Sequence, residues 1–259
     1  FDILGGGQNL IPYQDDILLN LVTCVLVIFG GIGFLVIREV IAKRFRWKKL
    51  SMHAKVVLFM SLVLTAAGTV LLKLTEDITW MGAFFTSVSA RTAGFSTFPL
   101  GSFSGAGLLT VIVLMVIGAS PGSTGGGIKT TTCYVLFEGI RSSATNTSEK
   151  AFRYAVPADV FRKAAVITLL AIGIVLSGTY ILVILEPGVP FLDALFEMSS
   201  AFGTAGLSTG ISAGLCDAAK ILTILIMFIG RLGPLTIASL WYFTKGERVS
   251  YPEGNIAIG

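Results

Sequence analysis

Residues 89–97 read Ser89-Ala90-Arg91-Thr92-Ala93-Gly94-Phe95-Ser96-Thr97, and residues 200–209 read Ser200-Ala201-Phe202-Gly203-Thr204-Ala205-Gly206-Leu207-Ser208-Thr209. The second stretch repeats the first with one inserted residue, about 112 residues further along the chain. Each copy ends an apolar segment, 80–90 or 191–202, that is too short to cross a hydrocarbon core of about 30 Å. Because each also follows a longer apolar run, the pattern predicts two re-entrant half-helices.

Five longer apolar runs surround these segments, at about 17–41, 54–74, 106–140, 164–185 and 219–243. Hydrophobic residues make up 54% of the 259 residues and charged residues 13%, about half the share usual in soluble domains. The mean hydropathy is +0.84. The chain is therefore predicted to be an all-α integral membrane protein built from span, half-helix, span units, and we expect no enzymatic activity.

Basic residues mark one side of the membrane. Segments 43–55, 138–163 and 244–259 hold 13 of the 19 Lys and Arg residues. By the positive-inside rule these segments are cytoplasmic, so we expect a multi-pass protein of the cell inner membrane with a cytoplasmic C-terminus.

Glycine after a half-helix suits a site for a dehydrated monovalent cation. Such an ion needs a ring of backbone carbonyls in place of its water shell, and glycine allows backbones to approach a narrow axis. The partial negative charge at the C-terminal end of each half-helix also favours a cation there. A Thr-Ala-Gly tripeptide alone is a weak signal, but its position after two half-helices is a strong one.

The third apolar run contains a second glycine cluster. Residues 118–129 include five Gly and one Pro, which cost about 1 and 3 kcal/mol relative to Ala inside a helix. We expect a broken helix there, with unwound backbone lining a pore. Close helix packing is the alternative, but three consecutive glycines at 125–127 exceed what packing requires.

These motifs resemble the Ktr/Trk/HKT superfamily of potassium translocators, and most closely its KtrB-type members. The resemblance covers the whole chain and is carried by both Thr-Ala-Gly motifs, by residues 118–129 and by Gly230-Arg231-Leu232-Gly233-Pro234. It implies four fused repeats around one pore. Residues 1–52 would be the tail of the second repeat, with its outer helix and cytoplasmic loop; 53–160 the third repeat; and 161–259 the fourth. Further repeats are expected upstream, with Phe1 just past the second filter glycine.

The resemblance also assigns roles to residues. The selectivity filter that binds potassium would consist of Thr92, Ala93, Gly94, Phe95, Thr204, Ala205, Gly206 and Leu207. An intramembrane gate below the filter would consist of Gly118, Gly122, Ser123, Thr124, Gly125, Gly126, Gly127, Lys129 and Arg231. The resemblance further implies a homodimer regulated by a cytosolic RCK-type, KtrA-like nucleotide-binding subunit, with K+ as the transported ion, Na+ as a candidate activating ion and no organic cofactor.

Three charged residues in apolar surroundings permit more than one interpretation. Arg231 lies within the last span and is expected to face the pore interior, or else to pair with Glu197 as a purely structural partner. Glu197 itself either tunes the field near the ion or is an exposed surface acid. Lys129 either belongs to the gate or extends to the cytoplasmic interface.

Other functional classes fit the sequence less well. A sodium- or proton-coupled symporter of the broken-helix type needs titratable or ion-ligating side chains at the unwound segments, where only Glu197 and Lys129 are nearby. Residues 122–130 nearly match a phosphate-binding loop, but Ile128 separates its Gly and Lys and no strand precedes it. A structural subunit without transport leaves the repeated half-helices unexplained.

Overall fold

The structure is a computed structural model that describes residues 9–145, 150–152, 154–155, 157–233 and 236. In this part of the chain the helices are α1 (Ile17–Ile32), α2 (Phe34–Ala42), α3 (Met52–Thr75), α4 (Trp80–Ser89), α5 (Gly105–Val116), α6 (Thr130–Thr145), α7 (Ala158–Leu185), α8 (Phe191–Gly203) and α9 (Asp217–Leu232). Four 3-10 turns lie at Ile11–Tyr13, Trp47–Lys49, Leu100–Ser102 and Ser212–Gly214. The strands described, β1 (Lys150–Ala151) and β2 (Tyr154–Ala155), form a two-residue hairpin. The predicted all-α class is confirmed.

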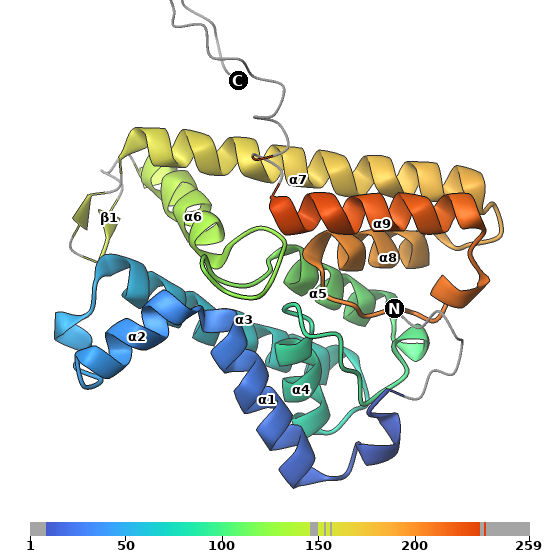
Figure 1. Cartoon of the computed structure of the whole chain (residues 1–259), viewed down its shortest axis with the longest axis horizontal. Helices are drawn as coiled ribbons and strands as arrows, with labels where there is room; N and C mark the ends of the chain where they lie inside the picture. Colours follow the sequence, from blue (N-terminus) through green and yellow to red (C-terminus); the bar gives the residue numbers. More distant parts are fainter. Residues whose placement is uncertain (1–8, 146–149, 153, 156, 234–235, 237–259) are drawn as a thin grey trace, which may run out of the picture.

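The order of span, half-helix and second helix occurs twice (Figure 1). In the described residues, α3 and α7 are each long and apolar enough to cross a membrane, and the bent pair α1–α2 qualifies if counted as one span. Helices α4 and α8 have only 10 and 13 residues, as expected of half-helices. The predicted fifth span continues past α9 into residues that lie outside the described part of the chain.

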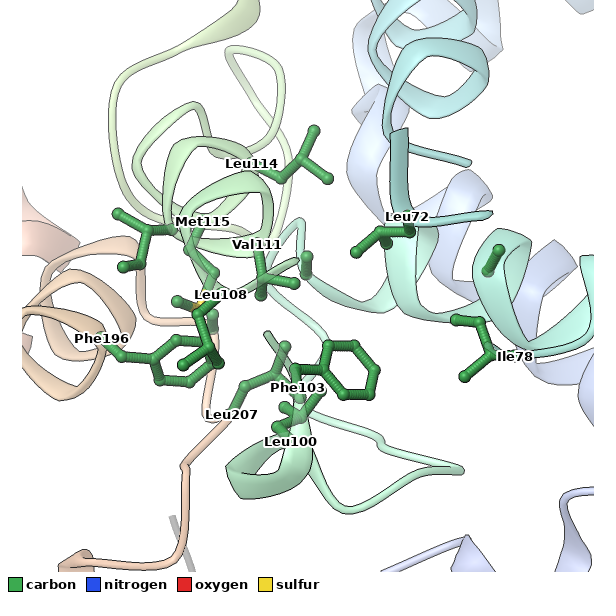
Figure 2. Close-up of a cluster of buried hydrophobic side chains, with 14 residues drawn as sticks. Leu72, Ile78, Leu100, Phe103, Leu108, Val111, Leu114, Met115, Phe196 and Leu207 are labelled. Carbon is green, nitrogen blue, oxygen red and sulfur yellow. The ribbon is translucent and has the colours of Figure 1, made fainter. Parts of the chain in front are cut away.

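A cluster of buried hydrophobic side chains joins the two repeats (Figure 2). Val111 and Met115 of α5 are fully buried, and so is Phe196 of α8. Leu207, from the loop after α8, belongs to the same cluster. Helix α5 of one repeat therefore packs on the half-helix of the other, which holds the ends of both half-helices near each other.

The first predicted span is not one continuous helix. Residues 17–41 were expected to form a single span, but the chain bends by 96° between α1 and α2. Gly33, at the bend, has a φ of 91° and ψ of 143°, a conformation that residues with a side chain rarely adopt. Gly233 ends α9 with almost the same angles, 90° and 139°. Both helices therefore end at the same kind of glycine break.

The expected break in the third apolar run is present. Helix α5 ends at Val116 and α6 begins at Thr130. The intervening loop is closed at its base by a parallel bridge between Ile117 and Ile128, and the Ile128 N–H donates to the Val116 carbonyl at 3.0 Å. The loop lies in the middle of the molecule, between α1–α2 and α9 (Figure 1).

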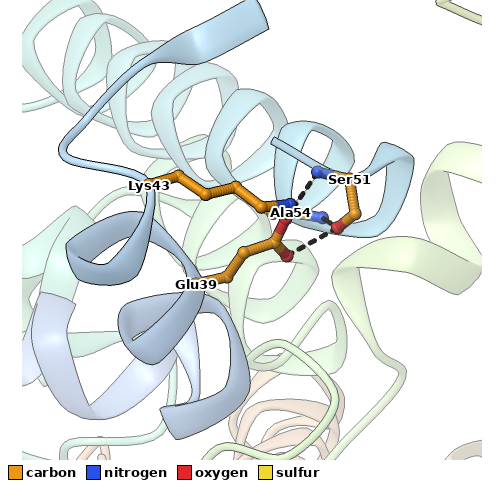
Figure 3. A network of polar contacts seen from close by, with 4 residues as sticks. All are labelled: Glu39, Lys43, Ser51 and Ala54. Atoms are coloured by element: carbon orange, nitrogen blue, oxygen red, sulfur yellow. Dashed lines mark hydrogen bonds and ion pairs between the residues drawn. The ribbon is translucent and has the colours of Figure 1, made fainter. Parts of the chain in front are cut away.

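A carboxylate connects the bent helix α2 to the start of α3 (Figure 3). Glu39 accepts hydrogen bonds from the Lys43 ammonium at 2.5 Å, the Ser51 N–H at 2.6 Å and the Ser51 hydroxyl at 2.7 Å. The Ser51 hydroxyl oxygen in turn accepts the Ala54 N–H at 3.2 Å and so caps α3. The basic loop 43–50 is thereby fixed at both ends.

Glu39→Ala is expected to destabilise the protein. The Ser51 N–H and hydroxyl lose their acceptor, which costs about 1 kcal/mol because water reaches part of this site. Thermal unfolding in detergent should show a lower midpoint for Glu39→Ala than for Lys48→Ala, a control at an exposed position of the same loop. Equal midpoints for the two variants would contradict the anchoring role of Glu39.

Candidate functional site

The two half-helices end in loops with the same backbone pattern. After α4, Thr92 and Gly94 have φ values of 74° and 80°. After α8, Thr204 and Gly206 have φ values of 49° and 88°. Each loop therefore takes a left-handed conformation at its threonine and again at its glycine. This common geometry explains the glycine in both copies of the motif, since glycine adopts such angles without strain.

These two loops touch each other through their backbones. A Cβ atom placed on Gly94 would lie 2.6 Å from the Ala205 carbonyl oxygen and 3.3 Å from the Gly206 Cα. There is no room for a side chain at this contact. The structure thus brings together the predicted filter segments 92–95 and 204–207, which are separated by more than a hundred residues.

Four carbonyl groups in these loops have no hydrogen bond partner within the described residues. They belong to Thr92, Ala93, Thr204 and Ala205. Two later carbonyls of the first loop do have partners: that of Phe95 accepts the Ser89 hydroxyl at 2.5 Å, and that of Gly94 accepts the Asn9 side-chain amide at 2.9 Å. The unpartnered carbonyls are the groups that can ligate a cation.

Asn9 is a residue of this site that the sequence did not indicate. Besides the contact of its amide with Gly94, the adjacent Leu10 N–H donates to the Ser96 carbonyl at 3.0 Å. The segment before α1 therefore runs along the first loop. The expected position of Phe1 beside the second filter glycine lies outside the described residues.

The loop between α5 and α6 packs directly against both threonines. The Gly126 N–H donates to the Thr204 hydroxyl oxygen at 3.0 Å. A Cβ atom on Gly125 would lie 3.0 Å from the Thr92 side-chain methyl group. Both glycines are buried. The predicted gate residues 125 and 126 thus lie directly against the threonine side chains of the predicted filter.

The end of α1 holds one side of this loop. The Ser120 N–H donates to the Gly31 carbonyl at 3.0 Å, and the Phe34 N–H donates to the Gly122 carbonyl at 3.3 Å. A Cβ atom on Gly33 would lie 2.9 Å from the Pro121 carbonyl oxygen. The bend at Gly33 is therefore shaped by the loop that packs against it.

Two cationic side chains donate hydrogen bonds to carbonyl groups of the loop. The Arg231 guanidinium at the end of α9 donates to the Thr124 carbonyl, and the Lys129 ammonium donates to the Gly125 carbonyl at 2.7 Å. Lys129 is therefore part of the loop network. Arg231 is exposed rather than buried, and it contacts the predicted gate.

Glu197 does not pair with Arg231. The Glu197 side chain on α8 is fully buried, so it is not a surface acid either. Its carboxylate accepts the Ser208 hydroxyl, the Thr209 N–H at 3.3 Å and the Ser212 hydroxyl at 3.1 Å. These donors directly follow the second loop, so the idea of a structural ion pair with Arg231 was wrong.

Side-chain metal ligands are not grouped in this part of the chain. Among the described residues, no cluster of three or more His, Cys, Asp or Glu side chains has a geometry that holds a metal ion. The arrangement instead offers backbone oxygens at the C-terminal ends of two half-helices, which is the chemistry of monovalent cation coordination.

Known proteins are similar to this chain in sequence and in fold. The chain is 36% identical to Ktr system potassium uptake protein B of Bacillus subtilis over 97% of its length, and 31% identical to the potassium/sodium uptake protein NtpJ of Enterococcus hirae over 100%. These matches cover 59% and 61% of the two relatives, so the chain spans about three fifths of their length. The solved structure of the potassium transporter TrkH from Vibrio parahaemolyticus superposes with a TM-score of 0.71 at 21% identity, over 86% of this chain and 52% of that one.

The family model described as a cation transport protein, TrkH, matches residues 50–244. That range includes both Thr-Ala-Gly loops, both half-helices and the loop between α5 and α6. The chain therefore belongs to the TrkH family of cation transport proteins.

Proposed function

We propose that this chain takes part in potassium uptake across the cell membrane through a carbonyl-lined selectivity filter. The observation that carries the proposal is the contact between two glycine loops whose Thr and Ala carbonyls have no partner among the described residues. Potassium is favoured because the relatives are named as potassium uptake proteins. The filter residues would be 92–95 and 204–207, with matching loops from the repeats expected upstream.

Selectivity in this proposal follows from coordination. A potassium ion that sheds its water needs several oxygens at once, and converging backbone carbonyls supply them without a fixed charge that would trap the ion. The C-terminal ends of α4 and α8 point at these loops and add their partial negative charge. Glycine at 94 and 206 keeps the loops close enough to share one ion.

The gate in this proposal is the loop 118–129 together with Arg231. The loop packs against Thr92 and Thr204. In this proposal that position closes the exit from the filter. Arg231 both holds the loop at Thr124 and places a positive charge beside the path. Conduction then requires the loop to leave Thr204, Gly31 and Arg231 together, a change of population between two states.

The proposal also covers the membrane location, the orientation and the partners of the protein. The chain is a membrane protein by family and by its apolar helices. We place it in the inner membrane with loop 43–55 and the C-terminus in the cytoplasm, although the C-terminus lies outside the described residues. A homodimer and a cytosolic RCK-type subunit agree with the relatives' being named as parts of a Ktr system. The basic loops 43–55 and 141–153 are candidate docking sites.

Ion coupling is the main alternative to a simple filter. One relative is named as a potassium/sodium uptake protein, which favours testing a sodium requirement. Rubidium uptake into proteoliposomes that contain the full-length protein, measured with and without sodium, distinguishes a filter from a symporter and from a structural subunit. Uptake without sodium or a proton gradient supports a filter alone; uptake that requires a cotransported ion supports a symporter; no uptake supports a structural subunit.

Substitution of the filter glycines should reduce discrimination between potassium and sodium. In Gly94→Ala the new Cβ meets the Ala205 carbonyl, and in Gly206→Ala the backbone must keep a φ near +88° that alanine disfavours. We expect selectivity to fall by about tenfold, equivalent to about 1.4 kcal/mol. The measurement is rubidium uptake under sodium competition.

Gly214→Ala is the matched control for these glycine variants. A Cβ atom there has nothing within 4 Å, and its φ is not positive. Its selectivity should equal that of the parent protein. If well-inserted Gly94→Ala and Gly206→Ala proteins also discriminate like the parent, residues 92–95 and 204–207 are not the filter.

Release of the gate loop should raise potassium flux. Arg231→Gln removes the guanidinium that bonds to Thr124 as well as the positive charge, and a charge-assisted hydrogen bond of about 1.5 kcal/mol corresponds to about tenfold in the loop's population. We therefore expect up to about tenfold more flux with unchanged selectivity, since the filter carbonyls remain. The potassium flux of Arg231→Lys, which keeps the charge, should lie between that of the parent protein and that of Arg231→Gln.

Deleting residues within 122–127 should also raise potassium flux and should make that flux less dependent on the cytosolic partner. Uptake with and without the partner measures both effects. Parent-like flux and regulation in both the shortened-loop and Arg231→Gln proteins would place the gate elsewhere.

A further inference from the structure

Glu197 binds the segment that directly follows the second filter loop. Its Oε1 atom accepts hydrogen bonds from the Ser208 hydroxyl and the Thr209 N–H, and its Oε2 atom accepts one from the Ser212 hydroxyl. The two serine hydroxyls are also 2.9 Å apart. We call Glu197, Ser208, Thr209 and Ser212 the carboxylate clamp.

The carboxylate of the clamp is buried and forms no ion pair with a side chain in the part of the chain that the structure describes. Glu197 has no exposed surface, and no Lys or Arg among the described residues forms an ion pair with it. Burying a carboxylate is costly unless hydrogen bonds satisfy it. Among the described residues every donor to this carboxylate comes from residues 208–212, so its hydrogen bonds depend on the position of that segment.

The first filter loop has no such clamp. Helix α4 contains no acidic residue, and its Ser89 hydroxyl instead donates directly to the Phe95 carbonyl. Ser96, which aligns with Ser208, makes no side-chain hydrogen bond within the described residues. The two loops thus share one backbone shape but are held at their far ends by different groups.

Hydrogen bonds anchor the second filter loop at both of its ends. Residues 204 and 206 both take left-handed φ angles, and their carbonyl-bearing backbone crosses from the end of α8 to the 3-10 turn at Ser212–Gly214. One end is fixed by the Thr204 and Ala205 N–H groups, which donate to the carbonyls of Ala201 and Ser200 at 3.1 and 2.9 Å. The clamp fixes the other end.

We propose that Glu197 is a positioning residue for ion selectivity, because its carboxylate sets the place of the filter carbonyls at 204–206 through Ser208 and Ser212. This inference rests on the proposed filter. It assigns Glu197 a geometric role and not that of an ion ligand. The carboxylate acts through the loop and does not touch the ion.

Glutamine at position 197 distinguishes geometry from charge. Its carbonyl oxygen can accept from Ser208 and Thr209 as Oε1 does, while its amide donates to the Ser212 oxygen. The Ser212 hydroxyl is then free to donate to Ser208, at the 2.9 Å separation already present. The clamp therefore closes without a charge in Glu197→Gln, but not in Glu197→Met.

The experiment compares four variants of the full-length protein in proteoliposomes: Glu197→Met, Glu197→Gln, Ser208→Ala and the matched control Ser96→Ala. Rubidium uptake under sodium competition measures selectivity. We expect Glu197→Met and Ser208→Ala to lose selectivity by about tenfold, the change that corresponds to one lost hydrogen bond to a charged acceptor. Glu197→Gln should restore most of it, and Ser96→Ala should behave like the parent protein.

The outcomes separate this inference from the proposed filter. The filter variants Gly94→Ala and Gly206→Ala are measured in the same assay, and if both keep parent selectivity the filter assignment fails. If Gly206→Ala loses selectivity while Glu197→Met and Ser208→Ala keep it, only the clamp is overturned. Equal losses in Glu197→Gln and Glu197→Met also overturn it, since they show that the charge matters and not the position. If Glu197→Met does not insert, Ser208→Ala and Glu197→Gln decide by the same criteria.

Discussion

The structure depends on a backbone contact between two loops that leaves no room for a side chain. Gly94 of one repeat lies against Ala205 and Gly206 of the other, and glycine at 94 is what permits the approach. Apolar packing of α5 on α8, through Val111, Met115 and Phe196, brings the two half-helices to that distance. Packing in the core therefore brings together two loops whose Thr and Ala carbonyls have no hydrogen bond partner among the described residues.

The loop between α5 and α6 also depends on glycines for a close backbone contact. Its glycines allow backbone to lie against Thr92 and Thr204, while its edges are held by the end of α1 and by Arg231 of α9. Helices α1 and α9 both end at a glycine with φ near 90°. The loop is therefore bonded both to the end of α1 and to the end of α9.

Local features of the sequence predicted the helices well. Segments 80–90 and 191–202 were expected as half-helices and are observed at Trp80–Ser89 and Phe191–Gly203, because run length and glycine punctuation act over a few residues. The bend at Gly33 was not predicted. A glycine inside an apolar run is compatible with close packing or with a break, and here the loop residues Pro121 and Gly122, far along the chain, select the break.

The membrane class, the repeat and the glycine loops could be predicted from the amino-acid sequence, because hydropathy and backbone sterics are properties of short stretches. Which groups meet depends on the folded chain. Gly126 reaches Thr204 across 78 residues and Arg231 reaches Thr124 across 107, while Glu197 turns to Ser208 and Ser212 instead of to an arginine. Hydrogen bonds require a donor and an acceptor within about 3 Å, and that proximity is created by the packing of whole helices.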